Sequence, residues 1–199
     1  MNERPSTIII EPHVKGLIFD LDGTLADTMP LHFEAWHETL ALMGLRCPQE
    51  FLEHYKGVPT DRIVLEINRC FGYDIDARQF CAEKQRRFRT KLPRAEPIPE
   101  IVAVVHRYRE HLPMAVATGG TRTNVDLTLE AIDLQGCFAA VLTADDPVKP
   151  KPAPDIFLEA ARVMHLEPRH CQVFEDGDLG LEAARGAGMS TLDVRTVVN

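Results

Sequence analysis

An apolar run near the N-terminus ends in two aspartates, one residue apart, and a glycine. Residues 14–19 read Val-Lys-Gly-Leu-Ile-Phe, and residues 20–24 follow as Asp-Leu-Asp-Gly-Thr. A short apolar segment that ends in Asp-Gly predicts a buried β-strand whose carboxylates emerge at its C-terminal end. Open α/β sheets bind their ligands at that edge. The segment therefore predicts a parallel sheet with an acidic site where this strand ends.

The rest of the chain changes its pattern twice. From residue 30 to residue 92, apolar side chains recur at helical spacing, which predicts helices that begin near residues 30, 59 and 76. A proline-rich hinge follows at 93–99. Beyond the hinge, predicted helices alternate with short apolar strands at 113–118, 139–143, 171–174 and 191–194.

This alternation indicates the fold class. Strands that alternate with helices build a parallel sheet covered by helices on both faces. We therefore expect an α/β fold with a three-layer Rossmann-like core, interrupted after its first strand by an inserted α-helical cap. The expected boundaries assign residues 1–27 and 95–199 to the core and residues 28–94 to the cap.

Composition narrows the possible partners and the compartment. The 199-residue chain has a net charge of −8 and no long Lys/Arg run, which argues against binding to nucleic acid or to an anionic membrane. Its five cysteines are widely spaced, without a C-x-x-C pair, as is typical of a reducing compartment rather than a disulfide scaffold. No signal peptide or membrane-spanning run is recognised. We expect a cytoplasmic protein that is a monomer or a weak dimer.

The ends of four expected strands carry polar residues that suit a single site. Each strand ends in, or leads to, the following residues: Asp20 and Asp22; Thr118 with Gly119 and Gly120; Lys151; Glu175 with Asp176. Acids gathered in one cluster repel each other unless a hard cation lies among them, and Mg²⁺ suits a few carboxylates beside a phosphate. A hydroxyl, helix N-terminal amides and a lysine would bind an anion next to that metal.

These residues resemble the four motifs of the haloacid dehalogenase superfamily of phosphohydrolases. D-x-D-G-T stands at 20–24, the strand-ending Thr118 matches the second motif, and K-P-x-P-D stands at 151–155. Glu175-Asp176 matches the fourth motif, and the helical insert falls where that superfamily carries its cap. The resemblance extends over about residues 14–194. It implies phosphoryl transfer through an aspartyl phosphate.

The resemblance also implies a catalytic role for each core motif. Asp20 attacks phosphorus, while Asp22 protonates the departing sugar oxygen and then deprotonates the water that cleaves the intermediate. Thr118 and the two glycine amides after it hold the phosphoryl oxygens. Lys151 compensates the charge on the nucleophile and on the transferring group.

The implied cofactor is Mg²⁺. Its expected ligands are Asp20, Asp176 and the backbone carbonyl of Asp22, helped by Glu175 either directly or through water. Glu175 has an alternative role as a structural acid that supports Asp176. Two further acids are expected to cap helices or to lie in loops, and a position near the metal is the alternative for each: Asp145 and Asp178.

Within the superfamily, the chain resembles the β-phosphoglucomutase-like subfamily and, inside it, the small bacterial fructose-1-phosphate phosphatases. The resemblance implies candidate sugar-binding residues in the cap, some of which fit D-T-x3-H-x3-W or P-T-x-R-I: Thr28, His32, Trp36, Arg62 and Lys84, with Gly57-Val58 as a further match. Each has a structural alternative. Trp36 can pack in a helix interface, His32 can stabilise the hinge, and the two cations can be solvated helix charges.

Three functions remain open at this point. The first is a phosphatase acting on a small phosphorylated sugar. The second is a β-phosphoglucomutase, whose pattern has an arginine directly after Gly-Val-Ser/Thr and an asparagine after the second motif; here the corresponding residues are Thr60 and Arg122, which favours hydrolysis. The third is a non-enzymatic metal-binding regulator phosphorylated on Asp20, although the acid Asp22 and the large cap argue against it.

Overall fold

The computed structural model of the chain describes residues 8–55 and 58–198, which form two compact units. The core unit is Met1–Asp27 together with Ala95–Asn199, and the cap unit is Thr28–Arg94. Gly57, one of the residues matched to the subfamily, lies outside the described residues. Within the described ranges, no helix has both the length and the apolar character needed to cross a membrane.

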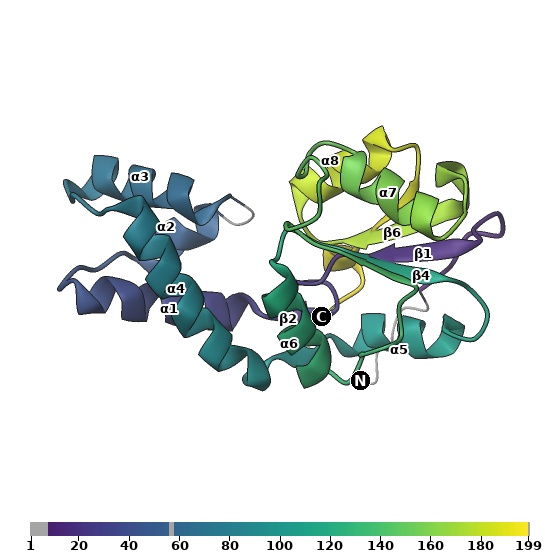
Figure 1. Cartoon of the computed structure of the whole chain (residues 1–199), viewed down its shortest axis with the longest axis horizontal. Helices are drawn as coiled ribbons and strands as arrows, with labels where there is room; N and C mark the ends of the chain where they lie inside the picture. The colour runs from purple at the N-terminus through teal and green to yellow at the C-terminus, as the bar shows by residue number, and fades with distance from the viewer. Residues whose placement is uncertain (1–7, 56–57, 199) are drawn as a thin grey trace. The chain divides into compact units, whose positions relative to one another are not determined.

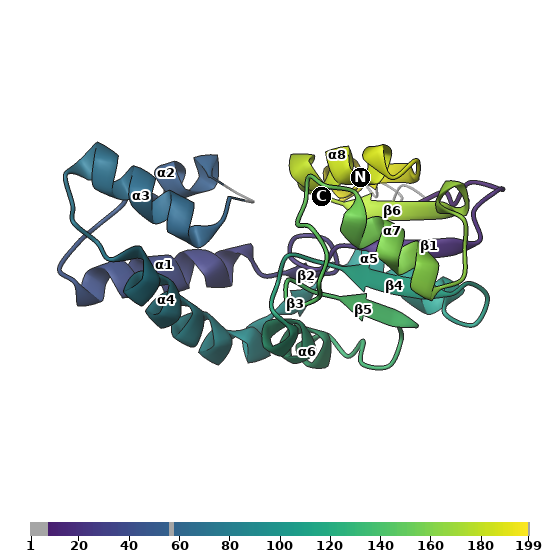
Figure 2. The same cartoon turned by 45° about the horizontal axis from the view of Figure 1, so that its top comes forward.

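The core unit contains a five-stranded parallel sheet in the order β5-β4-β1-β6-β7. Its strands are β1 (Gly16–Phe19), β4 (Met114–Ala117), β5 (Ala140–Leu142), β6 (Cys171–Glu175) and β7 (Ser190–Asp193). β1 lies in the centre, between β4 and β6, as Figure 2 shows for the strands drawn there. The predicted α/β core with a parallel sheet is confirmed.

Helices cover both faces of this sheet. Figure 1 shows α7 (Asp155–Val163) and α8 (Asp178–Gly186) on one face, and α5 (Pro99–Tyr108) and α6 (Arg122–Ala131) on the other. Side chains alternate along a strand, so Ile18 packs into the cluster formed with α7 and α8 while its neighbours Leu17 and Phe19 face the opposite side. All three are fully buried, which explains why β1 is a continuous apolar run.

Strand pairing continues past the ends of two central strands and fixes the first site residues. The amide of Asp20 donates to the carbonyl oxygen of Phe174 on β6 at 3.0 Å. The amide of Thr118 donates to the carbonyl oxygen of Leu142 on β5, also at 3.0 Å. Because the strands are parallel, these residues emerge at the same edge of the sheet.

A second, two-stranded antiparallel sheet forms where the chain leaves and re-enters the core unit. It pairs β2 (Ala26–Asp27) with β3 (Glu96–Pro97). The sequence predicts a proline-rich hinge at 93–99, and the structure adds this strand pair and a 3₁₀ turn, η1 (Leu92–Arg94). Pro97 is tolerated because a two-stranded sheet has edge positions that need no further amide donor.

The cap unit is helical. Its elements are α1 (Met29–Leu42), α2 (Gln49–His54), α3 (Thr60–Phe71) and α4 (Ala77–Lys91), and α4 packs against both α1 and α3. Three of these helices match the predicted ones, and α2 is an addition. Ion pairs join α1 to α4, with Glu38 accepting from Lys91 at 2.6 Å and from Arg87 at 3.1 Å.

Two short 3₁₀ turns complete the core unit. They are η2 (Pro168–His170), which precedes β6, and η3 (Val194–Thr196), which follows β7.

Candidate active site

The Asp-Gly turn after β1 allows the carboxylates of Asp20 and Asp176 to lie close to each other. Asp20 is 6% exposed at the end of β1, and the following turn is closed by hydrogen bonds from the amides of Leu25 and Ala26 to the carbonyl oxygen of Leu21. Gly23 has a φ of +86°, and a Cβ there would collide with the carboxylate of Asp176. Only glycine meets both conditions, so the motif glycine lets β1 and the loop after β6 approach each other.

Lys151 lies between two of the predicted acids. Its Nζ donates to Asp20 Oδ1 at 2.6 Å and to Glu175 Oε2 at 2.7 Å, and it lies 5.0 Å from the ring centroid of Phe157. Burial by itself lowers the pKa of Lys151, but the charges of Asp20 and Glu175 outweigh burial and raise it. Lys151 therefore remains protonated and compensates the charge of both acids.

Three carboxylates form a cluster that could hold a metal ion. One oxygen each from Asp20, Glu175 and Asp176 lies within 4.8 Å of the others. Burial and then the charge of Asp20 raise the pKa of Asp176 to about 6. A 3.3 Å hydrogen bond from Thr24 Oγ1 lowers this pKa but does not offset the rise. An all-oxygen donor set that is destabilised by its own charge fits a hard divalent cation such as Mg²⁺.

Both carboxylate oxygens of Glu175 accept hydrogen bonds. The amide of Gly177 donates to Glu175 Oε1 at 2.9 Å, while Lys151 occupies the other oxygen. Burial is the largest cause that raises the pKa of Glu175, followed by the charge of Asp20, and Lys151 opposes both. This side chain thus connects the lysine to the loop that carries Asp176.

The close packing of Glu175 against Gly180 yields a testable prediction. A Cβ at Gly180, in the first turn of α8, would collide with the Glu175 carboxylate and its Cγ. We expect Gly180→Ala to displace Glu175, to lower the free energy of unfolding by about 1–3 kcal/mol as other overpacking substitutions do, and to reduce turnover. Urea unfolding and steady-state kinetics measure the two effects.

The same helix offers a matched control for this prediction. A Cβ at Gly186 would make an ordinary contact 3.8 Å from Pro154 Cβ. Gly186→Ala should leave turnover unchanged and stabilise the protein by about 0.4–1 kcal/mol through a less flexible unfolded chain. Equal behaviour of the two variants would contradict the packing assigned to Gly180.

A glycine-containing turn follows β4. Thr118 is 2% exposed, and its Oγ1 accepts a hydrogen bond from the amide of Gly120 at 3.1 Å. A Cβ placed at Gly120 would lie 3.6 Å from Thr118 Oγ1 and 3.7 Å from Asp22 Oδ2. Asp22 therefore adjoins the turn that precedes α6.

The structure gathers all predicted core residues at one edge of the sheet. From β1 come Asp20 and Asp22, from β4 come Thr118, Gly119 and Gly120, and from later loops come Lys151, Glu175 and Asp176. Lys149, two residues before Lys151, has a side chain that is 78% exposed. Of the two lysines in this loop, Lys151 therefore contacts the carboxylates and Lys149 does not lie buried beside them.

Three of the predicted cap residues, His32, Trp36 and Lys84, pack together inside the cap unit. Lys84 Nζ lies 2.8 Å from His32 Nδ1 and 5.9 Å from the Trp36 ring, and the His32 ring stacks on Phe88 at 3.7 Å between centroids. Burial and then the charge of Lys84 hold the pKa of His32 well below its usual range. Thr28, which is buried, precedes the first residue of α1.

The remaining cap candidates differ in exposure. Trp36 is buried and packs on Phe80 with centroids 4.9 Å apart, whereas Arg62 is exposed on α3. Contact of any of these side chains with a sugar stays a prediction.

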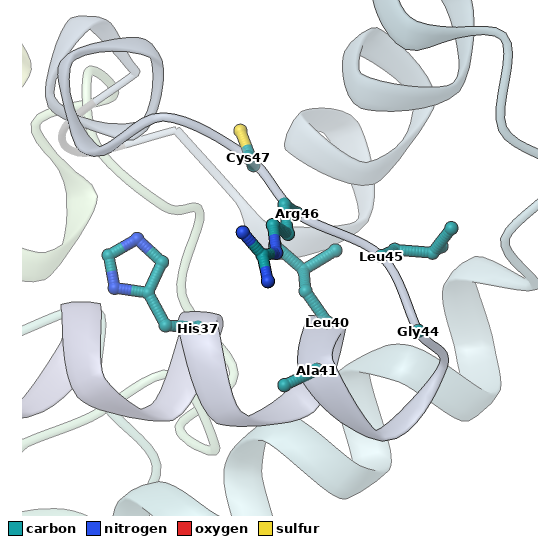
Figure 3. A pocket seen from close by; sticks show the side chains of 7 residues that line it. All are labelled: His37, Leu40, Ala41, Gly44, Leu45, Arg46 and Cys47. Atoms are coloured by element: carbon teal, nitrogen blue, oxygen red, sulfur yellow. The ribbon is translucent and has the colours of Figure 1, made fainter.

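A separate open hollow of about 440 Å³ lies on the cap unit (Figure 3). It is lined by His37, Leu40, Ala41, Gly44, Leu45, Arg46 and Cys47, none of which is a predicted site residue.

Two contributors to the site were not assigned a role from the sequence. Thr24 is fully buried and donates to Asp176, and Gly180 leaves the space that the Glu175 side chain fills. Thr24 is the last residue of the D-x-D-G-T motif, so its position was part of the sequence signal. The function of both residues depends on which distant carboxylate each one faces, and the spacing along the chain does not contain that information.

Comparison with known proteins shows the family to which the chain belongs. The model of haloacid dehalogenase-like hydrolases matches residues 17–194. The chain belongs to this family and is therefore an enzyme of the hydrolase class. It is similar to fructose-1-phosphate phosphatase YqaB of Escherichia coli (strain K12), with 41% identity over 184 residues that cover 90% of this chain and 96% of that protein.

Two further relatives extend the comparison. Beta-phosphoglucomutase of Bacillus subtilis (strain 168) is 27% identical over 191 residues, which cover 91% of this chain and 83% of that protein. The crystal structure of CbbY from Rhodobacter sphaeroides in complex with phosphate superimposes with a TM-score of 0.76 at 26% identity, covering 89% of this chain and 84% of that one.

Proposed function

We propose that this enzyme is a Mg²⁺-dependent phosphatase of small phosphorylated sugars, with fructose 1-phosphate as the first substrate to test. One observation carries the proposal: Lys151 bridges Asp20 and Glu175 while Asp176 completes an acidic cluster at the same sheet edge. A nucleophilic carboxylate that must approach an anionic ester needs positive charge beside it, which Lys151 and a cation held by the acidic cluster would supply together. The 41% identity to a fructose-1-phosphate phosphatase supports the choice of substrate class.

The chain's own residues suffice to assign the two chemical steps. In the first step an oxygen of Asp20 attacks phosphorus, the bond from phosphorus to the sugar oxygen breaks, and Asp22 gives its proton to that oxygen. In the second step Asp22 takes a proton from water, whose oxygen attacks the aspartyl phosphate and releases Asp20 and inorganic phosphate. Thr118 and the amides after it hold the phosphoryl oxygens, and Lys151 keeps Asp20 oriented.

The acidic cluster supports Mg²⁺ as the cofactor. Asp20, Asp176 and the backbone carbonyl of Asp22 would hold the ion, with Glu175 contributing directly or through water. When bound, the ion neutralises charge on the substrate and on the nucleophile.

The hydrogen bonds of the Arg122 side chain favour hydrolysis over the mutase alternative. This residue stands near the place where mutases of the subfamily have asparagine, and its guanidinium donates to the carbonyl oxygen of Val141 at 2.6 Å and to Asp146 at 3.4 Å. A guanidinium engaged in this way is poorly suited to replace an asparagine that would contact the sugar. The higher identity to a phosphatase, 41% against 27% to a β-phosphoglucomutase, supports the same choice.

A panel of phosphorylated sugars tests the proposal. We expect release of inorganic phosphate from fructose 1-phosphate in the presence of Mg²⁺ and its loss with EDTA, because the acidic cluster is not neutralised without a cation. A coupled assay for glucose 6-phosphate made from β-glucose 1-phosphate detects the mutase. Turnover that persists in EDTA, or sustained isomerisation without phosphate release, would contradict the proposal.

The finer assignments belong to the same proposal. Thr28, His32, Trp36, Arg62 and Lys84 remain the candidates by which the cap reads the sugar. A cytoplasmic location and a monomer or weak dimer complete the proposal, and the wide spacing of the five cysteines supports that location.

A further inference from the structure

Two loops at the active-site edge are tied together by hydrogen bonds that the catalytic mechanism does not use. The first loop is the turn of residues 118–121 between β4 and α6, which we call the phosphoryl-binding turn. The second loop follows β5 and leads toward Lys151. The amide of Ala144 in the second loop donates to the carbonyl oxygen of Gly120 at 2.9 Å, so the two backbones are in direct contact.

Asp145 provides the most direct connection between these loops. Its Oδ2 accepts a hydrogen bond at 2.8 Å from the amide of Arg122, the first residue of α6. Thr121 precedes the helix and would ordinarily supply the cap, but its Oγ1 is buried without a hydrogen-bond partner among the described residues. An acid 23 residues further along the chain therefore performs the capping role at this helix.

A second set of contacts fixes the loop that carries Asp145. Asp146 Oδ2 accepts from the amide and the hydroxyl of Thr143 at 2.8 and 2.9 Å, and from Arg122 Nη2 at 3.4 Å. The Arg122 guanidinium also donates to the carbonyl oxygen of Val141 at 2.6 Å. Arg122 thus reaches the second loop through its backbone and through its side chain.

We propose that Asp145 is a positioning residue for phosphoryl binding: by accepting the first amide of α6, it holds the phosphoryl-binding turn in its binding conformation. This inference rests on the proposed function. Amides bind an oxyanion well only if they are already oriented, since reorientation costs free energy at each binding event. Asp145 does not contact the phosphoryl group itself and acts through the turn.

Charge and position make opposite predictions for Asp145. A carboxylate next to a site for a dianion repels it, so removing the charge should strengthen phosphate binding if charge dominates. Removing the hydrogen-bond acceptor should weaken phosphate binding if position dominates. Asp145→Asn removes the charge and keeps an acceptor oxygen, whereas Asp145→Ala removes both, and the pair separates the two effects.

The experiment measures the dissociation constant of inorganic phosphate by calorimetry, with Mg²⁺ present, and KM and kcat for the substrate that the wild type hydrolyses. We expect Asp145→Ala to weaken phosphate binding about three- to tenfold, the size of a lost helix cap, and Asp145→Asn to remain near the wild type. KM should follow the phosphate affinity. Asp126→Ala, which removes an exposed acid from the same helix, is the control and should change neither constant.

Substitutions at Arg122 test the backbone contact independently. Arg122→Pro removes the amide that Asp145 binds, and it is sterically allowed because proline suits the first turn of a helix and Thr121 is already extended (φ −74°, ψ 152°). Arg122→Ala keeps that amide and removes the guanidinium. We expect the proline variant to bind phosphate more weakly than the alanine variant, and Asp145→Ala to add nothing further in the proline background.

The outcomes separate this inference from the proposed function. Phosphate binding and hydrolysis by the wild type support the proposed function, and their absence overturns it together with this inference. If the wild type binds phosphate and both Asp145 variants bind it more tightly, charge dominates and the positioning role is wrong. If Asp145→Ala lowers the melting temperature but leaves phosphate affinity and KM unchanged, Asp145 is merely a structural cap and the inference is again overturned.

Discussion

Asp20→Asn is expected to reduce turnover by about four orders of magnitude or more, as removal of a nucleophile does in other enzymes that use covalent catalysis. An amide oxygen cannot form the acyl phosphate that the proposed mechanism requires. The residue lies 2.6 Å from Lys151 at the end of the central strand, and asparagine keeps its size while removing the nucleophilic oxygen and one negative charge. Steady-state kinetics with the substrate that the wild type hydrolyses measures the loss.

Stability should not explain that loss. The amide side chain of the Asp20→Asn variant retains an oxygen that can accept the hydrogen bond from Lys151, and the substitution removes one of three crowded carboxylates. We expect a melting temperature equal to or above that of the wild type. Asp133→Asn is the matched control: it makes the same chemical change at an exposed residue with φ of 56°, a conformation that asparagine tolerates well, and it should leave turnover unchanged. Turnover by Asp20→Asn within tenfold of the wild type would exclude Asp20 as the nucleophile.

The parallel sheet was predictable because strands that are buried on both faces are apolar along their whole length. β1 is apolar over its whole length since both faces of the sheet are covered, and the strand ends where Asp20 begins. Parallel topology then requires the C-terminal ends of β1, β4 and β6 to share an edge. In this part of the chain, the apolar pattern of each strand therefore predicts both the strand and the sheet edge at which its last residues lie.

The pairing of β2 with β3 had no comparable signal. Each strand has two residues, which is too short for any periodicity, and the register joins Ala26 to Pro97 across the whole inserted cap. The helix α2 is similarly short, at six residues, and its single buried residue, Leu52, gives no helical repeat. Elements of this size are defined by tertiary contacts, which a single sequence does not display.

The same distinction applies to side chains in the site. Residues whose role depends on position at a strand end, such as Asp20 and Thr118, can be predicted from the chain alone. Asp145 and Gly180 act through a partner on another element, the amide of Arg122 for the first and the side chain of Glu175 for the second. The sequence predicts only that Asp145 is a capping or loop acid, because it does not show which helix end the acid faces.

Lys151→Met is expected to reduce turnover by about 10²–10³-fold, the usual cost of losing one charged or oriented donor at a site of developing charge. Methionine keeps an unbranched apolar stem that can pack on Phe157 and removes the ammonium group that binds Asp20 and Glu175. The two carboxylates then face each other in a buried site with no compensating charge from the lysine. We therefore expect the variant to lose stability as well as activity.

The stability loss should depend on pH in a defined direction. In EDTA we expect Lys151→Met to lower the free energy of unfolding by about 3 kcal/mol near pH 8, as breaking a buried ion pair does. The raised pKa of Lys151 means that its contribution is fully present below the ordinary lysine pKa of 10.5.

The acid partner sets the lower end of this pH window. Burial and the charge of Asp20 raise the pKa of Glu175 to about 7 from 4.5, and Lys151 is the group that opposes this rise. A carboxyl whose pKa is raised on folding holds more protons in the native state, so its contribution to stability falls as pH rises between those two values. Without Lys151, Glu175 keeps its proton to a higher pH, and the deficit of the variant should shrink as pH falls toward 5.

Lys149→Met provides the control for all three readouts. Its side chain is 78% exposed and lies 3.9 Å from Asp155, an arrangement that contributes at most about 1 kcal/mol. Turnover, stability near pH 8 and the pH dependence should all match the wild type in this control. Urea unfolding of the three proteins across the pH range makes the comparison, and a Lys151→Met deficit that stays constant from pH 8 to pH 5 would show that the lysine acts through packing rather than through the two carboxylates.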